Sequence, residues 1–186
     1  MKKILILLFL VLLIPVLSYS QINFATAGVY GGIMLPMGDF SDVYKASPTV
    51  GAEGYYSVTQ SIDIVADVAY NFLSSKQTYT NTNFYYLEST AGIRYNFTPT
   101  KEKVFAEAEI GAYTFGAKFT YYDIYGTPFT VNTSTTDFGL NVGVGAVFPI
   151  SSNFAITGKA KFHNVFTSGS STNYFGLTAG FDYKFR

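Results

Sequence analysis

Two glutamates near the middle of the chain have a spacing that paired acid/base catalysis could use. Glu107 and Glu109 stand two residues apart in "VFAEAEIGAYTF", so an extended strand places both carboxylates on one face. In a closed interior such carboxylates need cationic or hydrogen-bonding partners. The polar faces of other segments offer four bases for this role: Arg94, Lys159, Lys161 and Lys184. We therefore interpret the pair as part of a structural network, with catalysis as the alternative.

His163 is the only histidine of the chain, and a serine nucleophile could lie near it. The following segment "TSGSS" supplies Ser168, Ser170 and Ser171, but its Ser, Thr, Gly and Asn content is typical of a surface loop. A lone histidine in a chain without cysteine makes no metal-ligand set. The glycines of "GVYGGI" and "GVGAVF" belong to strand patterns rather than to a phosphate-binding turn. The sequence predicts no catalytic residue, no metal and no cofactor.

The first 20 residues have the features of a secretory signal peptide. Lys2 and Lys3 precede an apolar run of 14 residues, too short for a membrane-spanning helix, and Ser18 and Ser20 suit cleavage after residue 20. An uncleaved anchor helix is the alternative. We expect residues 21–186 to form one exported domain. Because 12 acidic residues balance 12 basic ones, the charge of the chain does not predict a nucleic-acid partner.

Apolar residues recur at every second position in most of the mature chain, which is typical of β-strands. Eight segments follow this pattern: 24–35, 49–58, 62–72, 84–97, 104–115, 137–148, 154–163 and 173–186. The connections between them alternate between long, as at 36–48, 73–82, 117–135 and 164–173, and short. This layout predicts an all-β fold, an eight-stranded antiparallel up-and-down barrel with both termini on the short-turn side.

The two faces of these strands differ in a way that indicates which one is outside. One face is aliphatic or small in the middle of each strand and aromatic toward both ends, as expected of a transmembrane barrel with two aromatic girdles. Exposing the charged face to lipid would cost roughly 2 to 4 kcal/mol for each base near the midplane. A soluble lipocalin-like barrel, with its apolar face inward, is the alternative. The predicted polar network of the lumen comprises Glu53, Asp63, Asp67, Glu88, Arg94, Glu107, Glu109, Asp137, Lys159, Lys161, Asp182 and Lys184.

Taken together, the signal peptide, the eight strands, the alternating loops and the closing stripe "NYFGLTAGFDYKFR" resemble the small outer-membrane β-barrel family of OmpX and the OmpA transmembrane domain. The resemblance implies a monomer in the outer membrane of a Gram-negative bacterium, with periplasmic termini and contacts to membrane lipids. It also implies insertion by the outer-membrane assembly machinery, which reads a C-terminal signal. The residues that match this signal are Gly176, Gly180, Phe181, Tyr183 and Phe185, whereas Arg186 departs from it.

The third long connection keeps a strand-like pattern and is rich in aromatic residues. We expect the two flanking strands to continue through it as a hairpin beyond the membrane, with Tyr121, Tyr122, Tyr125 and Phe129 as candidate contact residues. A stiff hairpin without a partner is the alternative. The leading hypothesis is a non-enzymatic envelope protein whose loops bind an extracellular protein or surface ligand. A small pore and a lipid-modifying enzyme are the alternatives.

Overall fold

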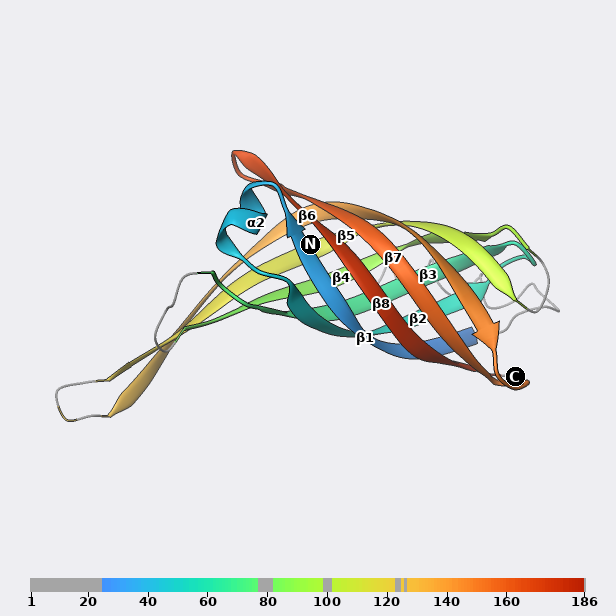
Figure 1. Ribbon diagram of the computed structural model, residues 1–186, viewed down its shortest axis with the longest axis horizontal. Helices are drawn as coiled ribbons and strands as arrows, with labels where there is room; N and C mark the ends of the chain where they lie inside the picture. Colours follow the sequence, from blue (N-terminus) through green and yellow to red (C-terminus); the bar gives the residue numbers. More distant parts are fainter. Residues whose placement is uncertain (1–24, 77–81, 99–101, 123–124, 126, 186) are drawn as a thin grey trace, which may run out of the picture.

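The protein forms a closed antiparallel barrel whose strands follow one another in chain order (Figure 1). The computed structural model describes residues 25–76, 82–98, 102–122, 125 and 127–185. Its strands are β1 (Ala25–Met37), β2 (Ser47–Ser57), β3 (Ile62–Leu73), β4 (Thr82–Asn96), β5 (Lys103–Tyr122), β6 (Pro128–Pro149), β7 (Phe154–Thr167) and β8 (Ser170–Lys184). The last strand pairs with the first, from Thr26 opposite Lys184 to Met37 opposite Asn173. The predicted eight-stranded up-and-down barrel is confirmed.

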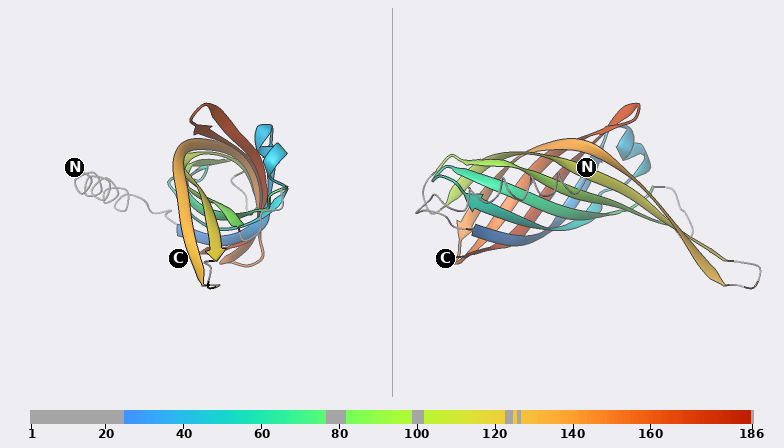
Figure 2. Two further views of the ribbon diagram at one scale, coloured as in Figure 1. Left: turned by 90° about the vertical axis from the view of Figure 1, so that its left-hand side faces the viewer. Right: turned by 180° about the vertical axis from the view of Figure 1, so that it is seen from behind.

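One short helix, α2 (Asp39–Val43), interrupts the first long connection and lies at the long-loop end of the barrel (Figures 1 and 2). The sequence did not predict it, because five residues are too few to show a period of 3.6. None of the described helices is long and apolar enough to span a membrane. The predicted signal peptide and Arg186 lie outside the described residues.

The fourth long connection was predicted wrongly. Strands β7 and β8 continue to pair through it, from Asn164 opposite Asn173 to Thr167 opposite Ser170. Only Ser168 and Gly169 remain between the strands, and Gly169 takes a φ of +94°, which favours glycine. The high Ser, Thr and Asn content indicated a loop, but these residues also suit a strand that leaves the membrane into water.

By contrast, the third long connection extends as expected. Strands β5 and β6 pair without interruption up to Tyr122 opposite Pro128. The neighbouring strand β4 begins at Thr82, opposite Phe119, and β7 pairs with β6 only as far as Phe138. The end of the β5–β6 hairpin therefore projects beyond the rest of the barrel, as Figure 1 shows.

The outer wall of the barrel is apolar, and its lumen is polar over the short-turn half. Val29, Ile93 and Val144 on the wall are 63%, 59% and 58% exposed, whereas Arg94 and Glu109 inside are 0% and 2% exposed. A soluble barrel has the opposite arrangement, with its apolar face buried. The distribution is that of a barrel whose wall contacts lipid.

An apolar cluster fills the lumen at the long-loop end, next to the predicted polar network. The buried members of this cluster, called the mouth cluster below, are Met34, Tyr44, Leu73, Tyr86, Tyr113, Val165 and Tyr174. Phe40 of α2 packs onto this cluster, with its ring centroid 6.2 Å from that of Tyr86 and 6.5 Å from that of Tyr174. The first long connection thus closes the mouth of the barrel with its own aromatic side chains.

Close packing in the lumen depends on glycine where a large ring crosses the barrel. The Tyr30 ring lies over Gly51, so a Cβ at residue 51 would be 2.4 Å from that ring and 2.7 Å from the carbonyl oxygen of Val68. Ordinary carbon contacts are about 3.5–4.0 Å. The position therefore accepts no side chain unless both Tyr30 and the Val68 backbone shift.

We predict that Gly51→Ala destabilises the barrel by about 1–3 kcal/mol, the usual cost of overpacking a filled interior. Gly54→Ala in the same strand is the matched control, since its Cβ would meet only the Thr26 carbonyl oxygen at 3.8 Å. Urea titration of the refolded proteins in detergent micelles gives both free energies of unfolding. Equal stability of the two variants would contradict the packing argument.

Candidate functional site: the packed lumen and the projecting hairpin

Arg94 lies at the centre of the polar lumen and is fully buried. Its Nη2 is 2.7 Å from Glu53 Oε2 and 2.8 Å from Glu107 Oε2, and its Nε donates to Glu107 at 2.9 Å. The rings of Tyr55 and Phe105 lie 4.5 and 4.1 Å from the guanidinium carbon. A planar cation is thus held between two carboxylates and two aromatic rings, an arrangement that a lysine could not reproduce.

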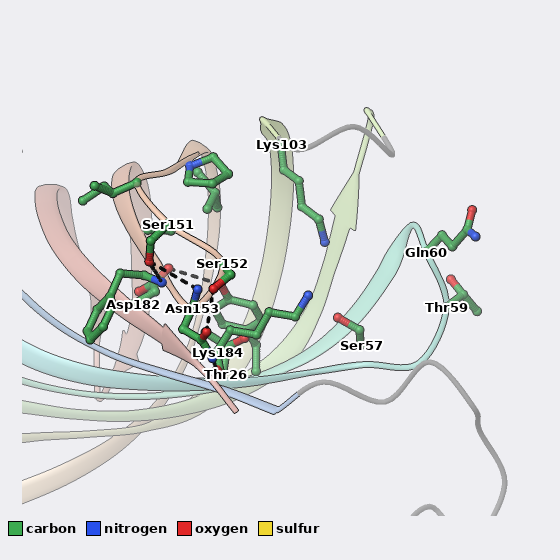
Figure 3. A pocket seen from close by; sticks show the side chains of 16 residues that line it. Thr26, Ser57, Thr59, Gln60, Lys103, Ser151, Ser152, Asn153, Asp182 and Lys184 are labelled. Carbon is green, nitrogen blue, oxygen red and sulfur yellow. Dashed lines mark hydrogen bonds between the residues drawn. The ribbon is translucent and has the colours of Figure 1, made fainter. Parts of the chain in front are cut away.

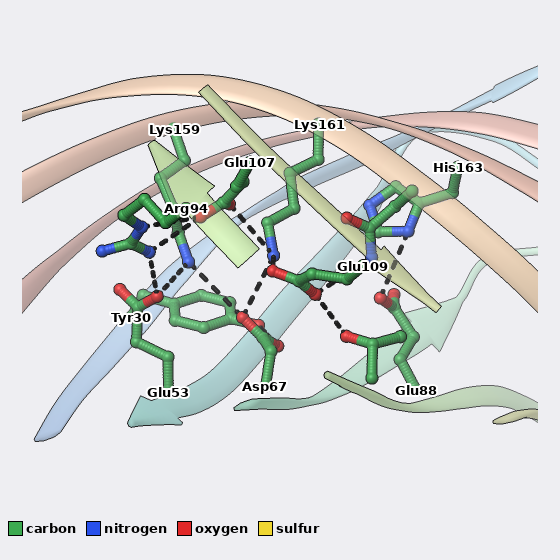
Figure 4. A network of polar contacts seen from close by, with 12 residues as sticks. Tyr30, Glu53, Asp67, Glu88, Arg94, Glu107, Glu109, Lys159, Lys161 and His163 are labelled. Carbon is green, nitrogen blue, oxygen red and sulfur yellow. Dashed lines mark hydrogen bonds and ion pairs between the residues drawn. The ribbon is translucent and has the colours of Figure 1, made fainter. Parts of the chain in front are cut away.

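Two lysines of β7 extend this network along the barrel axis (Figure 4). Lys159 and Lys161 are two residues apart, so both point inward. The Nζ of Lys159 is 2.9 Å from Glu53 and 3.4 Å from Asp67, while that of Lys161 is 3.3 Å from Asp67 and 2.8 Å from Glu109. Because Asp67 contacts both lysines, the ion pairs form one connected network across the lumen.

Buried carboxylates outnumber buried lysine and arginine side chains by seven to three among the described residues. Neutral hydroxyl and amide groups donate the hydrogen bonds that the cations cannot supply. These bonds run from Tyr30 to Asp67 at 2.5 Å, from Asn96 to Asp63 at 2.8 Å, from Thr157 to Asp182 at 2.5 Å, from Asn71 to Glu88 at 2.6 Å, and from Thr90 to Glu109. Such bonds reduce the cost of burying the charged groups.

The structure places ten of the twelve predicted network residues in the buried lumen: Glu53, Asp63, Asp67, Glu88, Arg94, Glu107, Glu109, Lys159, Lys161 and Asp182. The other two are half-buried and lie toward the ends of the barrel. Asp137 stands opposite Tyr113 at the long-loop end, and Lys184 stands opposite Thr26 at the short-turn end. Glu107 and Glu109 are at most 4% exposed, so neither carboxylate is presented to solvent as a catalytic acid or base.

Sequence reasoning missed the neutral members of the network. Tyr30 lies on the weakest of the predicted strands, whose faces were not assigned, and yet its hydroxyl bonds Asp67 and its ring lies 4.5 Å from Lys159 Nζ. Thr90 and Asn141 both donate to Glu109. Their place on the charged face of their strands was the one signal that could have identified them.

The structure brings His163 to other partners than the serines of the β7–β8 turn. Its ring stacks on Tyr174 with centroids 4.3 Å apart, and its Nδ1 is 3.3 Å from the Tyr113 hydroxyl and 3.5 Å from Glu88 Oε2. Ser171 lies opposite Phe166 in the ladder, which places it three residues, or about 10 Å, further along the strands. His163 thus belongs to the interior packing.

Side chains fill most of the lumen between its two ends. A cavity of about 20 Å³ remains beside Asp67, Lys161 and His163, which is room for one water molecule. At the short-turn end an open vestibule of about 800 Å³ lies between Lys103 and Lys184 (Figure 3). The vestibule ends inward where the Tyr55 hydroxyl donates to Asp182 at 3.2 Å, and the mouth cluster closes the other end.

The residues of the predicted insertion signal lie along β8, from Gly176 near its middle to Phe185 just after its end. Phe181, Tyr183 and Phe185 point outward and are 62%, 40% and 49% exposed. Gly180 faces the lumen, where a Cβ would lie 2.7 Å from the Tyr30 Cβ, and Gly176 faces His163. The aromatic residues therefore lie on the wall, and Gly180 lies where the interior is too crowded for a side chain.

The projecting hairpin carries an aromatic stripe on one face. Tyr121 stacks on Phe129 and Phe119, with ring centroids 5.3 and 6.4 Å apart, and Tyr121, Phe129 and Val131 are about half exposed. These odd-numbered residues continue the face that points into the lumen lower in the same strands. Tyr125 at the tip is 87% exposed. Tyr122 ends β5, and its side chain lies outside the described part of the molecule.

We predict that Arg94→Met destabilises the barrel by about 3–5 kcal/mol, because it leaves buried carboxylates without their cation. Urea titration in detergent micelles measures the change. The double variant Arg94→Met/Glu107→Gln should be more stable than the single variant, because one of the two stranded charges is gone. An Arg94→Met barrel as stable as the wild type would contradict the structural role of the network.

The family comparison agrees with this geometry. The sequence model of a family described as "Outer membrane protein beta-barrel domain" matches residues 6–185 of the chain. No curated protein sequence matches this chain.

Several solved structures have the same fold. Neisserial surface protein A shares 16% identity over 88% of this chain and 97% of its own, with a TM-score of 0.61. The attachment invasion locus protein Ail of Yersinia pestis shares 17% identity over 88% of this chain and 97% of its own, with a TM-score of 0.55. The outer membrane protein OprG of Pseudomonas aeruginosa shares 11% identity over 88% of this chain and 96% of its own, with a TM-score of 0.53. With the match over nearly the whole sequence, the chain belongs to the outer-membrane β-barrel family.

Proposed function

We propose that this protein is a non-enzymatic barrel of the outer membrane that presents its β5–β6 hairpin to partners outside the cell. The observation that carries the proposal is the stripe of Phe119, Tyr121, Phe129 and Val131 beyond the lipid-facing wall, of which the last three side chains are about half exposed. Aromatic side chains are enriched at protein interfaces, and an exposed apolar patch usually marks a binding surface. Ail is named for attachment, but its likeness to this chain carries the fold alone.

The orientation in the membrane follows from the asymmetry of the connections. Both described ends of the chain, Ala25 and Phe185, lie at the short-turn end, where Phe185 N–H donates to the Ala25 carbonyl. Outer-membrane barrels have short periplasmic turns and longer extracellular loops. We therefore infer periplasmic termini and place the hairpin and α2 outside the cell.

The packing of the lumen supports a non-conducting barrel over a small pore. An ion moving along the axis would have to break the pairs of Arg94, Lys159 and Lys161, which are all buried. It would then meet the mouth cluster, which offers aromatic surface in place of water. Neither barrier is compatible with steady conduction by the folded state.

The surroundings of the candidate catalytic groups support a non-enzymatic role. His163 is 4% exposed and lies between Tyr113, Tyr174 and Glu88, which leaves no room for a substrate beside it. Among the lumen cavities, the one that adjoins His163 is about 20 Å³ in volume, smaller than any lipid headgroup. The interior charges serve the stability of the barrel.

We predict that Tyr121→Ser/Phe129→Ser weakens adhesion of cells producing the protein several-fold, because it removes the aromatic contact surface. The measurement is retention on polystyrene coated with serum proteins, with deletion of residues 120–130 as the reference for complete loss. Thr130→Ala/Asn132→Ala, on the opposite face of the hairpin, is the matched control and should adhere as the wild type. Unchanged adhesion of the deletion variant would contradict the proposed surface role.

We further predict that the purified protein gives no steady single-channel current in planar lipid bilayers, because ion pairs and aromatic side chains fill its lumen. A variant that removes both barriers, Arg94→Ala with Phe40→Ala and Tyr44→Ala, should conduct more than the wild type. Reproducible currents from the wild-type barrel would favour the pore instead.

A further inference from the structure

The β6 strand has a long edge that pairs with nothing in the described part of the chain. Residues 128–137 bond to β5 on one side, but β7 reaches β6 only at Phe138, so their other side is unpaired. All residues from Pro128 to Thr136 are exposed. This run is the longest one-sided stretch among the described strands.

The direction of the free backbone groups follows from the ladder below. Ile150 N–H donates to the Phe154 carbonyl, so even-numbered residues of β6 direct their N–H and C=O groups toward the β7 side. No bulge interrupts the register between residues 128 and 147. Thr130, Asn132, Ser134 and Thr136 therefore present their N–H and C=O groups on the free edge.

This edge lacks the features that normally keep strand edges apart. Charged side chains, proline and bulges protect most exposed edges. Between residues 129 and 136 the sequence "FTVNTSTT" has no charge and no proline, and the pairing with β5 is regular. The side chains on the outward face are hydroxyl and amide groups, and opposed threonine and serine residues stabilise strand pairs.

We propose that the free edge of β6 pairs with the same edge of a second copy of this protein, as an antiparallel extension of the two hairpins. The inference rests on the proposed surface role and names the partner. A second copy fits because residues 129–136 carry no charge, so two identical edges do not repel each other. A two-fold axis also satisfies the free groups of both strands at once and leaves no further β6 edge for growth.

The two copies lie on facing membranes. In one membrane, every β6 strand runs from its tip toward the bilayer, so neighbouring copies offer parallel edges. Copies that project from opposite membranes offer antiparallel edges, which also pair more stably per residue. The protein therefore joins cells, or outer-membrane vesicles, that both carry it.

The first test mixes two populations of cells labelled with different fluorophores. When both produce the protein, mixed clumps should form, and when only one does, they should be at least tenfold fewer. Clumping that needs the protein on one population only would overturn the self-pairing but leave the surface role intact. If deletion of residues 120–130 changes neither clumping nor adhesion to protein-coated surfaces, both proposals fail.

The second test blocks the edge while keeping the hairpin. Ser134→Pro removes one free N–H that does not bond β5, and Ser134→Lys brings two like charges close together near the two-fold axis of the pair. Both should reduce clumping at least tenfold, whereas Ser134→Ala, which retains the N–H and loses only one hydroxyl contact, should keep most of the wild-type clumping. Ser134→Lys covers the case in which the proline variant misfolds. Normal clumping of both the folded Ser134→Lys and the folded Ser134→Pro proteins would overturn the proposal.

The third test reads the direction of pairing in cells that produce the protein. The chain has no cysteine, so single cysteines at residues 130–136 can be oxidised with diamide. Antiparallel pairing about a two-fold axis should give a disulfide-linked dimer mainly at one position near the centre of the run. Dimers at every second position would indicate parallel pairing within one membrane and would overturn the facing-membrane arrangement.

Discussion

Backbone hydrogen bonding in lipid is the constraint on which the rest of the structure depends. The hydrocarbon core offers no partner for a free N–H or C=O, so a sheet that crosses it must close on itself. Pairing of β1 with β8 achieves this closure. Because eight strands enclose only enough space for side chains, closure also dictates a filled interior. The network around Arg94 and the mouth cluster around Tyr86 are two ways of filling the same narrow space.

The strands and the polar interior were predictable from the sequence because both follow from alternation. A residue such as Glu109 or Lys161 on the charged face must point into the lumen, because the other face of the strand contacts lipid. Which side chains bond to one another inside the lumen was not predictable. Tyr30 joins Asp67 across a sequence separation of 37 residues, and only the register of β1 against β2 and of β2 against β3 brings them together. Helix α2 was missed because five residues are too few to show a helical period, and the tight β7–β8 turn was missed because its residues are also typical of loops.

The position of the water boundary can be followed along the β5–β6 hairpin. Ala112 and Phe138 point outward from the wall, and the next outward pair toward the tip is Thr114 and Thr136, whose hydroxyl groups are 2.8 Å apart. Beyond this pair the outward face is polar and the lumen-side face is aromatic, the reverse of the pattern lower down. The apolar residues of one strand thus lie on the outward face within the membrane and on the lumen-side face beyond it. A reading that assigned the apolar face to lipid throughout would point Phe129 and Tyr121 outward, whereas they lie on the face that continues the lumen.

The same constraint explains why an unpaired edge occurs where it does. A free run such as residues 128–137 could not exist in the wall, where each unsatisfied group would cost several kcal/mol. Water bonds the free groups beyond the boundary, so the edge becomes tolerable only there, and it remains available to another strand. The lumen has the opposite character, since its charges are bonded to each other and exclude partners. The stabilising network and the proposed contact surface therefore lie in separate parts of one sheet, and the hairpin can change its sequence without disturbing the Arg94 network.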